Sequence, residues 1–552
     1  MRRIILSMTA AMLSCTLFAQ TDSLKAVVNV HNEYNPVHIK VNKKSFVPTV
    51  AVGSNNSAPQ YEFTSEAMPY SGFVSERDTK GLAKEQSRQY SGYARAGYGI
   101  GNELDVKVAY NRDITPKDNI RFFGAIDGYK TGIERFQGNS KWHSRMYSSV
   151  AGLGYTHAFR GLRLGIGGDF GNRVFNYQSK EIAPNARSSQ NSMNYGVYID
   201  GESTLTGAFN YRFNAAYMDN SRKYTIDSNR GISERRANAG VEAWYVIDDD
   251  EIRKVCIDVN FDAFLYNSTL LKAANPYSNY FSIDVDPYID FVLLGWDVRL
   301  GSRMNLLTAN GPLFAISPDI KVKKALGRGV SLYVTATGGR TANSFARIES
   351  ITPYWNFDES LSKQLKPTYR IVDAVAGATF SAGAFSMDFT TGYAYTKDDL
   401  MQHYTKMPVQ PYDVVYSDFT QCNTHNVHVS LRAGYDLGGW LRIAGDSRYD
   451  FWGCGNSELL MMKPEVTCNL MAEVKPFKGF TLNVGYNFTY YTKSAGARTD
   501  SKSDLNARIN YNIFPWLGVY VQGSNLLNDR YLEYAGYETR GVRGLLGVSA
   551  NF

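Results

Sequence analysis

Apolar and polar residues alternate along most of the chain from about residue 90 onward. In the run from Val255 to Leu265, aliphatic and aromatic residues alternate mainly with cysteine, aspartate and asparagine. Successive side chains of a strand point to opposite faces, so this run predicts a strand with one apolar and one polar face. Its length matches the ~9–11 residues that a tilted transmembrane strand requires. Similar runs occur at residues 209–217, 385–395, 427–435, 482–490 and 509–521.

The connections between these runs alternate between short turns and long polar loops. Outer-membrane barrels have short turns on the periplasmic side and long loops outside, so each short turn predicts a periplasmic hairpin. Ten hairpins supply twenty strands, and one further strand at each end brings the prediction to 22, with both termini periplasmic. The turns lie at residues 112–118, 160–161, 204–207, 248–251, 292–294, 325–329, 381–384, 438–439, 475–479 and 514–516.

Tryptophan placement agrees with this topology. Trp296, Trp440 and Trp516 lie at or beside predicted periplasmic turns, and Trp244 lies a few residues before one. Tryptophan rings favour the membrane interface. We therefore expect these rings to mark the periplasmic boundary of the membrane.

The chain ends in an amphipathic run, Leu545 to Phe552, whose apolar residues share one face of a predicted strand. We expect this strand to close the barrel. The predicted fold is therefore all-β, a transmembrane antiparallel β-barrel of about 22 strands that occupies residues 90–552.

The first 89 residues lack this regular alternation. Residues 1–19 predict a signal peptide, because Arg2 and Arg3 precede an apolar run that ends at Ala19; a lipidated Cys15 is the less favoured alternative. Residues 20–89 predict an N-terminal arm, periplasmic or lumenal. After Ala19 no apolar run approaches the ~20 residues of a spanning helix. We expect an exported chain that lies in the cell outer membrane, in contact with its lipid.

Several motifs carry a resemblance to a known family. The residues 525–531, Tyr537, the run 540–543 and the end 547–552 resemble the closing strands of TonB-dependent outer-membrane receptors. Upstream, Ser317-Pro318-Asp319, the run 343–347, the run 366–369 and Lys463-Pro464-Glu465 resemble the plug-less, receptor-like barrels common in Bacteroidetes.

The resemblance has consequences for the residues before the barrel. It implies that a receptor plug needs about 130 residues or more, so residues 20–89 are too short for a plug. The run Val27 to Val30 resembles the segment by which receptors pair with TonB. An ordinary leader strand is favoured there, so contact with TonB stays open.

The composition excludes several classes of function. The formal net charge of +7 is spread over 552 residues without a concentrated patch, which argues against nucleic acid as a partner. The cysteines show no metal spacing, and a disulfide between Cys422 and Cys454, in adjacent predicted outer loops, is less favoured than unpaired thiols. His425 and His428 are three apart, so they would face opposite sides of a strand. The sequence predicts no enzyme, no catalytic residue, no cofactor and no metal site.

Two sets of residues are candidates for ligand contact. Polar residues predicted to face the lumen could line a path for cations, although any wide barrel needs a polar interior, and this second interpretation is favoured. The predicted outer loop at residues 340–367 carries the aromatic residues Tyr354, Trp355 and Phe357. It predicts a ligand site, a constriction inside the lumen or an exposed loop, and residues 397–424 predict a second outer loop. The polar lumenal set is Asp258, Asp262, Asp284, Asp286, Asp290, Asp297 and Arg299.

Two functions remain open at this point. The resemblance implies a receptor-like barrel for transport or ligand uptake across the outer membrane, with an unknown substrate. The alternative is a non-transporting structural or assembly barrel that anchors a partner protein complex. A periplasmic or surface lipoprotein is a candidate partner in either case.

Overall fold

The computed structural model describes residues 90–552 apart from the segments 135–140, 179–187, 205–206, 225–230, 248–251, 269–276, 328, 356–363, 408–413 and 492–500. The predicted signal peptide and N-terminal arm therefore lie outside the described residues and stay predictions. Strands make up most of what is described. No helix in this part of the chain is long and apolar enough to cross a membrane.

The elements follow one another in a simple order. They are β1 (Gly92–Gly99), β2 (Glu103–Thr115), β3 (Asp118–Glu134), β4 (Lys141–Ala158), β5 (Leu162–Asn176), β6 (Ser189–Ser203), β7 (Phe209–Arg222), β8 (Ile232–Val246), β9 (Ile252–Ser268), β10 (Tyr280–Leu293), β11 (Trp296–Leu307), β12 (Phe314–Gly327), β13 (Val330–Thr341), α2 (Phe345–Ile351), β14 (Thr368–Ala382), β15 (Phe385–Met407), β16 (Val414–Leu437), β17 (Leu441–Cys454), the 3-10 helix η3 (Ser457–Met462), β18 (Pro464–Val474), β19 (Phe480–Tyr491), β20 (Lys502–Phe514), β21 (Leu517–Ser524), β22 (Leu532–Tyr534), β23 (Tyr537–Glu538) and β24 (Arg543–Asn551).

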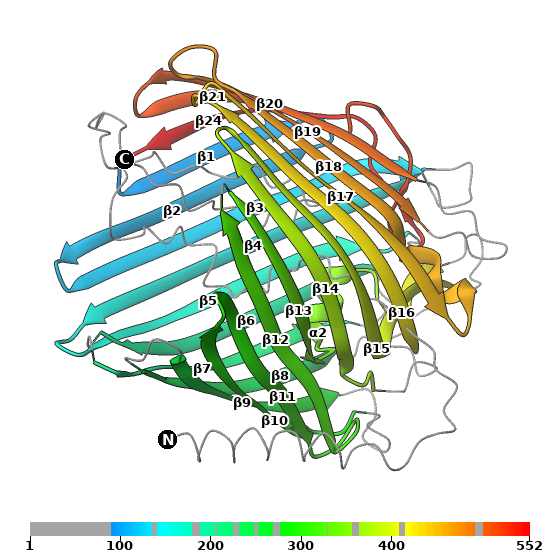
Figure 1. Cartoon of the computed structure of the whole chain (residues 1–552). Helices are drawn as coiled ribbons and strands as arrows, with labels where there is room; N and C mark the ends of the chain where they lie inside the picture. The colour runs from blue at the N-terminus through cyan, green and yellow to red at the C-terminus, as the bar shows by residue number, and fades with distance from the viewer. Residues whose placement is uncertain are drawn as a thin grey trace.

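The sheet is a closed antiparallel barrel of 22 strands (Figure 1). Each strand from β1 to β21 pairs with the next, and β24 pairs with both β21 and β1. At the closure, Tyr93 lies opposite Asn551 and Tyr98 lies opposite Leu546. The predicted strand number and the closing role of the last strand are confirmed. The short hairpin β22–β23 forms a separate two-stranded sheet.

All ten predicted short turns connect consecutive strands at one end of the barrel, which we call the turn end. The opposite end is the loop end. The link between β1 and β2 at the loop end has only three residues, 100–102, although long loops were expected there. The predicted outer loop at residues 397–424 is wrong, because β15 and β16 stay paired as far as Met407 and Val414. These strands continue well beyond the ~9–11 residues that cross a membrane.

The outer face of the barrel is apolar and the inner face is polar. On β9, Ile257, Phe261 and Leu265 are exposed on the outside, whereas Asp262 and Phe264 of the inner face are buried. Exposed apolar side chains recur in this way on most strands. A barrel that spans a lipid bilayer has this apolar outer band and a polar interior.

Three of the four tryptophans lie beside turns at the turn end, and their role as markers of the membrane boundary stays a prediction. Trp440 and Trp516 are each 49% exposed beside turns at the turn end, as expected of interfacial rings. Trp296 begins β11 directly after a turn and has the ammonium of Lys324 5.0 Å from its ring centroid. The prediction for Trp244 is wrong. Trp244 lies opposite Cys256 in the register, on the inner face of β8, so its ring points into the lumen.

Removing the last strand should open the barrel. Deletion of residues 544–552 leaves the edges of β1 and β21 unpaired, and unpaired backbone groups are costly in lipid. We expect loss of the compact band that an unheated barrel gives on a denaturing gel. Deletion of nine residues within 20–89 is the control and should retain this band. A compact, heat-modifiable band from the 544–552 deletion would contradict closure by β24.

Candidate functional site in the barrel lumen

Two loops from the loop end reach into the lumen. The helical loop, residues 342–355, follows β13 and contains α2, which lies within the ring of strands in Figure 1. The hairpin loop, residues 525–542, connects β21 to β24 and contains β22 and β23. Both loops contact inward-facing side chains of the barrel wall.

The helical loop begins with a capped helix held on the wall. The Ser344 side chain accepts a hydrogen bond from the Arg347 backbone N–H at 3.2 Å, which is the usual cap of a helix start. The backbone N–H of Phe345 donates to both carboxylate oxygens of Glu234 at 3.1 Å. The Phe345 ring packs 5.4 Å from Tyr266. Strands β8 and β9 therefore fix the start of the loop.

Arg222, the last residue of β7, fixes the end of the helical loop. Its side chain is only 3% exposed and lies 2.7 Å from the Glu349 carboxylate. The guanidinium also donates to the Pro353 carbonyl at 2.6 Å and to the Trp355 carbonyl. It lies 4.3 Å from the Trp355 ring centroid, and Trp355 Nε1 donates to Glu349 at 2.5 Å. The buried guanidinium of Arg222 therefore contacts the helix, the turn that follows it and the indole of Trp355.

The hairpin loop is fixed between two distant parts of the wall. The Tyr537 hydroxyl donates to the Val415 carbonyl of β16 at 2.5 Å. On the other side, Gln178, just after β5, donates to the Gly536 carbonyl at 2.8 Å. Gly536 has φ of +82°, and a Cβ there would lie 2.4 Å from Val415 Cγ1. The close approach to β16 therefore requires glycine.

The two loops meet through a stack of tyrosine rings. Tyr354 and Tyr537 are parallel, with ring centroids 3.6 Å apart and planes 7° apart. Burial raises the pKa of both phenols well above the usual value, so both remain neutral. Buried aromatic pairs of this kind add ~0.5–1.5 kcal/mol beyond their area.

This stack connects opposite walls of the barrel. The Tyr354 ring lies 5.5 Å from Phe175 of β5, while its carbonyl accepts from the Ser417 N–H of β16 at 2.8 Å. In the ring of 22 strands, β5 and β16 are eleven strands apart in either direction (16 − 5 = 11), which is half the circumference. The two loops therefore form a septum across the lumen at the loop end.

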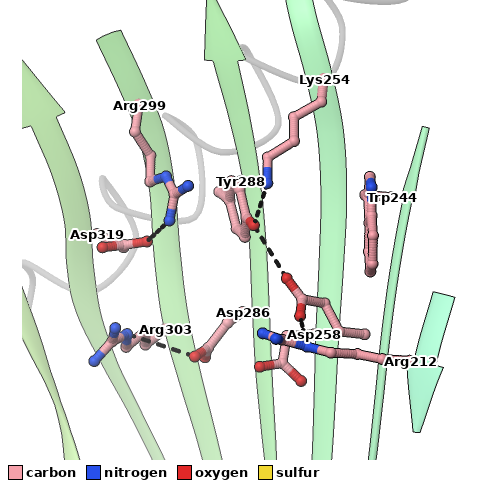
Figure 2. Close-up of a pocket in the computed structure, with 10 residues that line it drawn as sticks. Arg212, Trp244, Lys254, Asp258, Asp286, Tyr288, Arg299, Arg303 and Asp319 are labelled. Carbon is pink, nitrogen blue, oxygen red and sulfur yellow. Dashed lines mark hydrogen bonds and ion pairs between the residues drawn. The ribbon is translucent and has the colours of Figure 1, made fainter. Parts of the chain in front are cut away.

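A charged cavity lies in the same lumen, on the turn-end half of β7 to β12 (Figure 2). It has a volume of about 420 Å³. Four cationic and four acidic side chains line it, so its formal charge is zero (4 − 4 = 0), and Trp244 and Tyr288 add rings. The charged residues are Arg212, Lys254, Arg299, Arg303, Glu242, Asp258, Asp286 and Asp319.

Two ion pairs of the cavity are long, whereas Arg212 is closely paired with Glu242. Arg303 Nε lies 3.5 Å from Asp286 Oδ2, and Arg299 Nη1 lies 3.8 Å from Asp319 Oδ2. The Tyr288 hydroxyl is closer to its neighbours, 3.1 Å from Lys254 Nζ and 3.2 Å from Glu242 Oε1. The other oxygen of Asp286, Oδ1, is buried without a hydrogen-bond partner among the described residues. A polar solute could supply that partner.

The predicted lumenal acids divide into two groups. Asp258 and Asp286 line the cavity. Asp262 and Asp284 instead pair with Arg340, whose Nη2 lies 3.0 Å and 2.8 Å from their carboxylates.

The remaining predicted acids also pair with arginines. Asp290 accepts two hydrogen bonds from Arg299, at 2.7 Å and 2.9 Å. Asp297 lies 2.8 Å from Arg253. The acids therefore belong to a charge-balanced wall, which favours the polar-interior interpretation over a row of acids for cations.

The structure places the predicted aromatic residues inside the barrel. Tyr354 and Trp355 are buried in the septum, so of the three interpretations the constriction inside the lumen fits their positions. Phe357 lies outside the described residues. Ligand contact by these three residues stays a prediction.

Sequence reasoning missed the partners of these aromatics. Arg222, Glu349, Tyr177 and Tyr537 are the residues that hold Tyr354 and Trp355 in place; for example, the Tyr177 hydroxyl donates to the Trp355 carbonyl at 2.7 Å. Arg222 falls on the polar face of an alternating strand, which is the only signal the sequence offered. That signal is shared by many lumenal residues.

No protein-family model and no curated protein matches the sequence. Solved structures do match. A mutant of the ferric enterobactin receptor PfeA of Pseudomonas aeruginosa is 11% identical and has a TM-score of 0.62, over 84% of this chain and 80% of that chain. The chain has the barrel fold of TonB-dependent receptors. The copper transporter OprC is 9% identical, with a TM-score of 0.61 over 85% of this chain and 82% of that chain.

A third similar structure is the ferric-catecholate import receptor Fiu of Escherichia coli K12. It is 9% identical and has a TM-score of 0.60, over 84% of this chain and 82% of that chain. These three proteins are named as receptors or as a transporter. At such low identity the similarity establishes the fold and leaves the ligand of this chain unidentified.

Loss of Arg222 should release the helical loop from the wall. Removing one partner of a buried ion pair costs ~3–5 kcal/mol, and Arg222→Ala also removes a hydrogen-bond donor from the carbonyls of Pro353 and Trp355. Thr352 is fully buried in this loop, so we expect the thiol introduced by Thr352→Cys to react with a maleimide only when Arg222→Ala is also present. Labelling is compared with the parent chain, which carries the native cysteines.

Arg235→Ala is the matched control. Arg235 lies on the neighbouring strand β8, is 49% exposed at its side chain and pairs with Asp219 at 3.3 Å. This change should leave the introduced thiol of the Thr352→Cys variant unreactive. Equal labelling of the Thr352→Cys thiol in the Arg222→Ala and Arg235→Ala proteins would show that Arg222 does not hold the loop.

Proposed function

We propose that the chain is a receptor-like outer-membrane barrel that transports a polar ligand, with the septum controlling passage and the charged cavity contacting the ligand. The observation that carries this proposal is the septum, which joins opposite walls at the loop end while a charged cavity lies in the turn-end half. A barrel of 22 strands is wide enough to be a plugged transporter. Control of the lumen is therefore the first requirement for any such barrel.

The chemistry of the cavity indicates the class of ligand. Balanced charges, two rings and a buried carboxylate oxygen without a partner among the described residues suit a small solute with charged or hydrogen-bonding groups. An apolar solute would have to desolvate these groups without replacing their hydrogen bonds, which is unfavourable. The similar solved proteins bind or import metal complexes or copper by name, and this supports uptake as the class of activity.

The location and the partners belong to the same proposal. The apolar outer band supports contact with membrane lipid, and the exposed Trp440 and Trp516 support a membrane boundary at the turn end. With the turn end periplasmic, the septum faces outside and the cavity faces the periplasm. Contact with TonB and with a lipoprotein would then involve the turn end or the predicted arm at residues 20–89.

Breaking the tyrosine stack should increase ion flow through the barrel. Tyr354→Ala with Tyr537→Ala removes the contact between the two loops, and we expect larger single-channel conductance in planar bilayers and greater sensitivity of cells to bulky antibiotics. Phe170→Ala with Phe389→Ala is the matched control, because these two rings lie exposed on the outer face. Unchanged conductance in the double tyrosine variant would contradict control by the septum.

Charge changes in the cavity should alter ion selectivity once the septum is open. Asp286→Asn changes the formal charge of the cavity from zero to +1. In the double tyrosine variant, we expect it to shift the reversal potential in a KCl gradient toward anions. Asp436→Asn, at an exposed position near the β16–β17 turn, is the control. The same shift from both changes would mean that the cavity does not lie on the ion path.

Deletion of residues 20–89 separates transport from anchoring. If the septum controls passage, the arm-deleted barrel should stay closed and the tyrosine changes should open it. A barrel that opens on arm deletion alone would assign closure to the arm. If the chain is instead an anchor, deletion should release a co-purifying protein, and neither the deletion nor the tyrosine changes should alter conductance.

A further inference from the structure

We propose that Cys422 and Cys454 form a disulfide in the exported protein, which fixes the part of β16 that holds the septum. Their sulfur atoms lie 3.1 Å apart. Cys422 lies in β16, and Cys454 is the last residue of β17. Cys454 is opposite Thr424 in the register, so Cys422, two residues from Thr424, is its diagonal neighbour on the same face.

A buried ion pair lies beside the two thiols. Asp399 of β15 is opposite Cys422 and is almost fully buried. Its carboxylate lies 2.9 Å from Lys463 Nζ. Because Lys463 follows η3 and Cys454 precedes it, a disulfide and this ion pair would hold both ends of the segment 455–462. The thiols therefore lie in an ordered part of the loop end, where a small change in geometry is enough to bring two sulfurs to bonding distance.

The same part of β16 carries contacts to the helical loop. Gln421 exchanges two hydrogen bonds with the backbone of Lys366, at 2.8 Å and 2.7 Å, where the chain returns from the loop to β14. Four residues before that, Ser417 binds the Tyr354 carbonyl through its N–H and contacts Thr352 through its hydroxyl at 3.1 Å. A disulfide at Cys422 would restrain the strand next to these contacts.

The oxidation can be written in full. Two S–H bonds break and one S–S bond forms between Cys422 and Cys454. The two electrons and two protons pass to the disulfide of a thiol oxidoreductase, which becomes a dithiol. Thiol oxidoreductases of this oxidising kind act in the periplasm, where disulfides form and persist. The inference therefore rests on the export that the proposed function includes.

The experiment is peptide mapping of the full chain purified from outer membranes. The protein is denatured with iodoacetamide without reductant and then digested. We expect one linked pair of peptides, which lacks two hydrogens and contains Cys422 and Cys454, while Cys256 and Cys468 are alkylated. Recovery of both Cys422 and Cys454 as alkylated peptides from the outer-membrane fraction would overturn the proposal.

Variants separate this pair from other exchange products. Cys256→Ser with Cys468→Ser should keep the link, whereas Cys422→Ser should leave Cys454 alkylated. If the Cys422→Ser protein fails to assemble, the wild-type map still decides.

The outcomes distinguish this inference from the proposed function. A chain recovered outside the outer membrane would overturn both proposals. Alkylated Cys422 and Cys454 in a barrel whose conductance responds to the tyrosine changes would overturn the disulfide alone. A linked pair of peptides from a barrel whose conductance does not respond to the tyrosine changes would support the disulfide and overturn control by the septum.

Discussion

The structure depends on the requirement that every backbone N–H and C=O in the sheet find a partner. In hydrocarbon no water can replace a missing hydrogen bond, so a sheet that crosses lipid must close. The pairing of β24 with β1 meets this requirement. Closure also determines which face of each strand is inside, because a shift of one residue would exchange the faces. The polar lumen and the apolar outer band therefore follow from the same register.

A polar wall makes a septum of this kind achievable. Loops that enter the lumen need partners for their own backbone groups, and lumenal side chains such as Glu234, Arg222 and Gln178 supply them. Arg222 has lost most of its water, but the Glu349 carboxylate and two carbonyls replace that hydration. Such exchanges are nearly balanced in free energy. A loop held in this way can be well ordered and still be displaced by a competing ligand or partner.

Sequence reasoning predicted the barrel well because the strand period and the turn residues are local signals. The ten turns and the closing strand are examples. It was wrong for residues 397–424, because no local signal marks where β15 and β16 stop pairing. The prediction for Trp244 was wrong. It relied on the nearby turn and placed the ring at the membrane interface, whereas the strand pairing puts Trp244 on the inner face of β8. A constriction inside the lumen was one of three interpretations of the loop that carries Tyr354 and Trp355. The contacts that hold this loop could not be predicted, since Arg222 and Glu349 are separated by 127 residues.

The pairing of Asp286 distinguishes the cavity from the septum. In the septum, the Glu349 carboxylate lies 2.7 Å from Arg222 and accepts a hydrogen bond from Trp355 at 2.5 Å. In the cavity, the Asp286 carboxylate lies 3.5 Å from Arg303, and its other oxygen has no hydrogen-bond partner in the described part of the chain. Arg299 and Arg212, by contrast, are closely paired with Asp290 and Glu242. A carboxylate that is already withdrawn from water and only loosely paired gains most from a new partner. The cavity is therefore where a solute can bind at little cost to the wall, whereas the septum must lose its own contacts before anything passes.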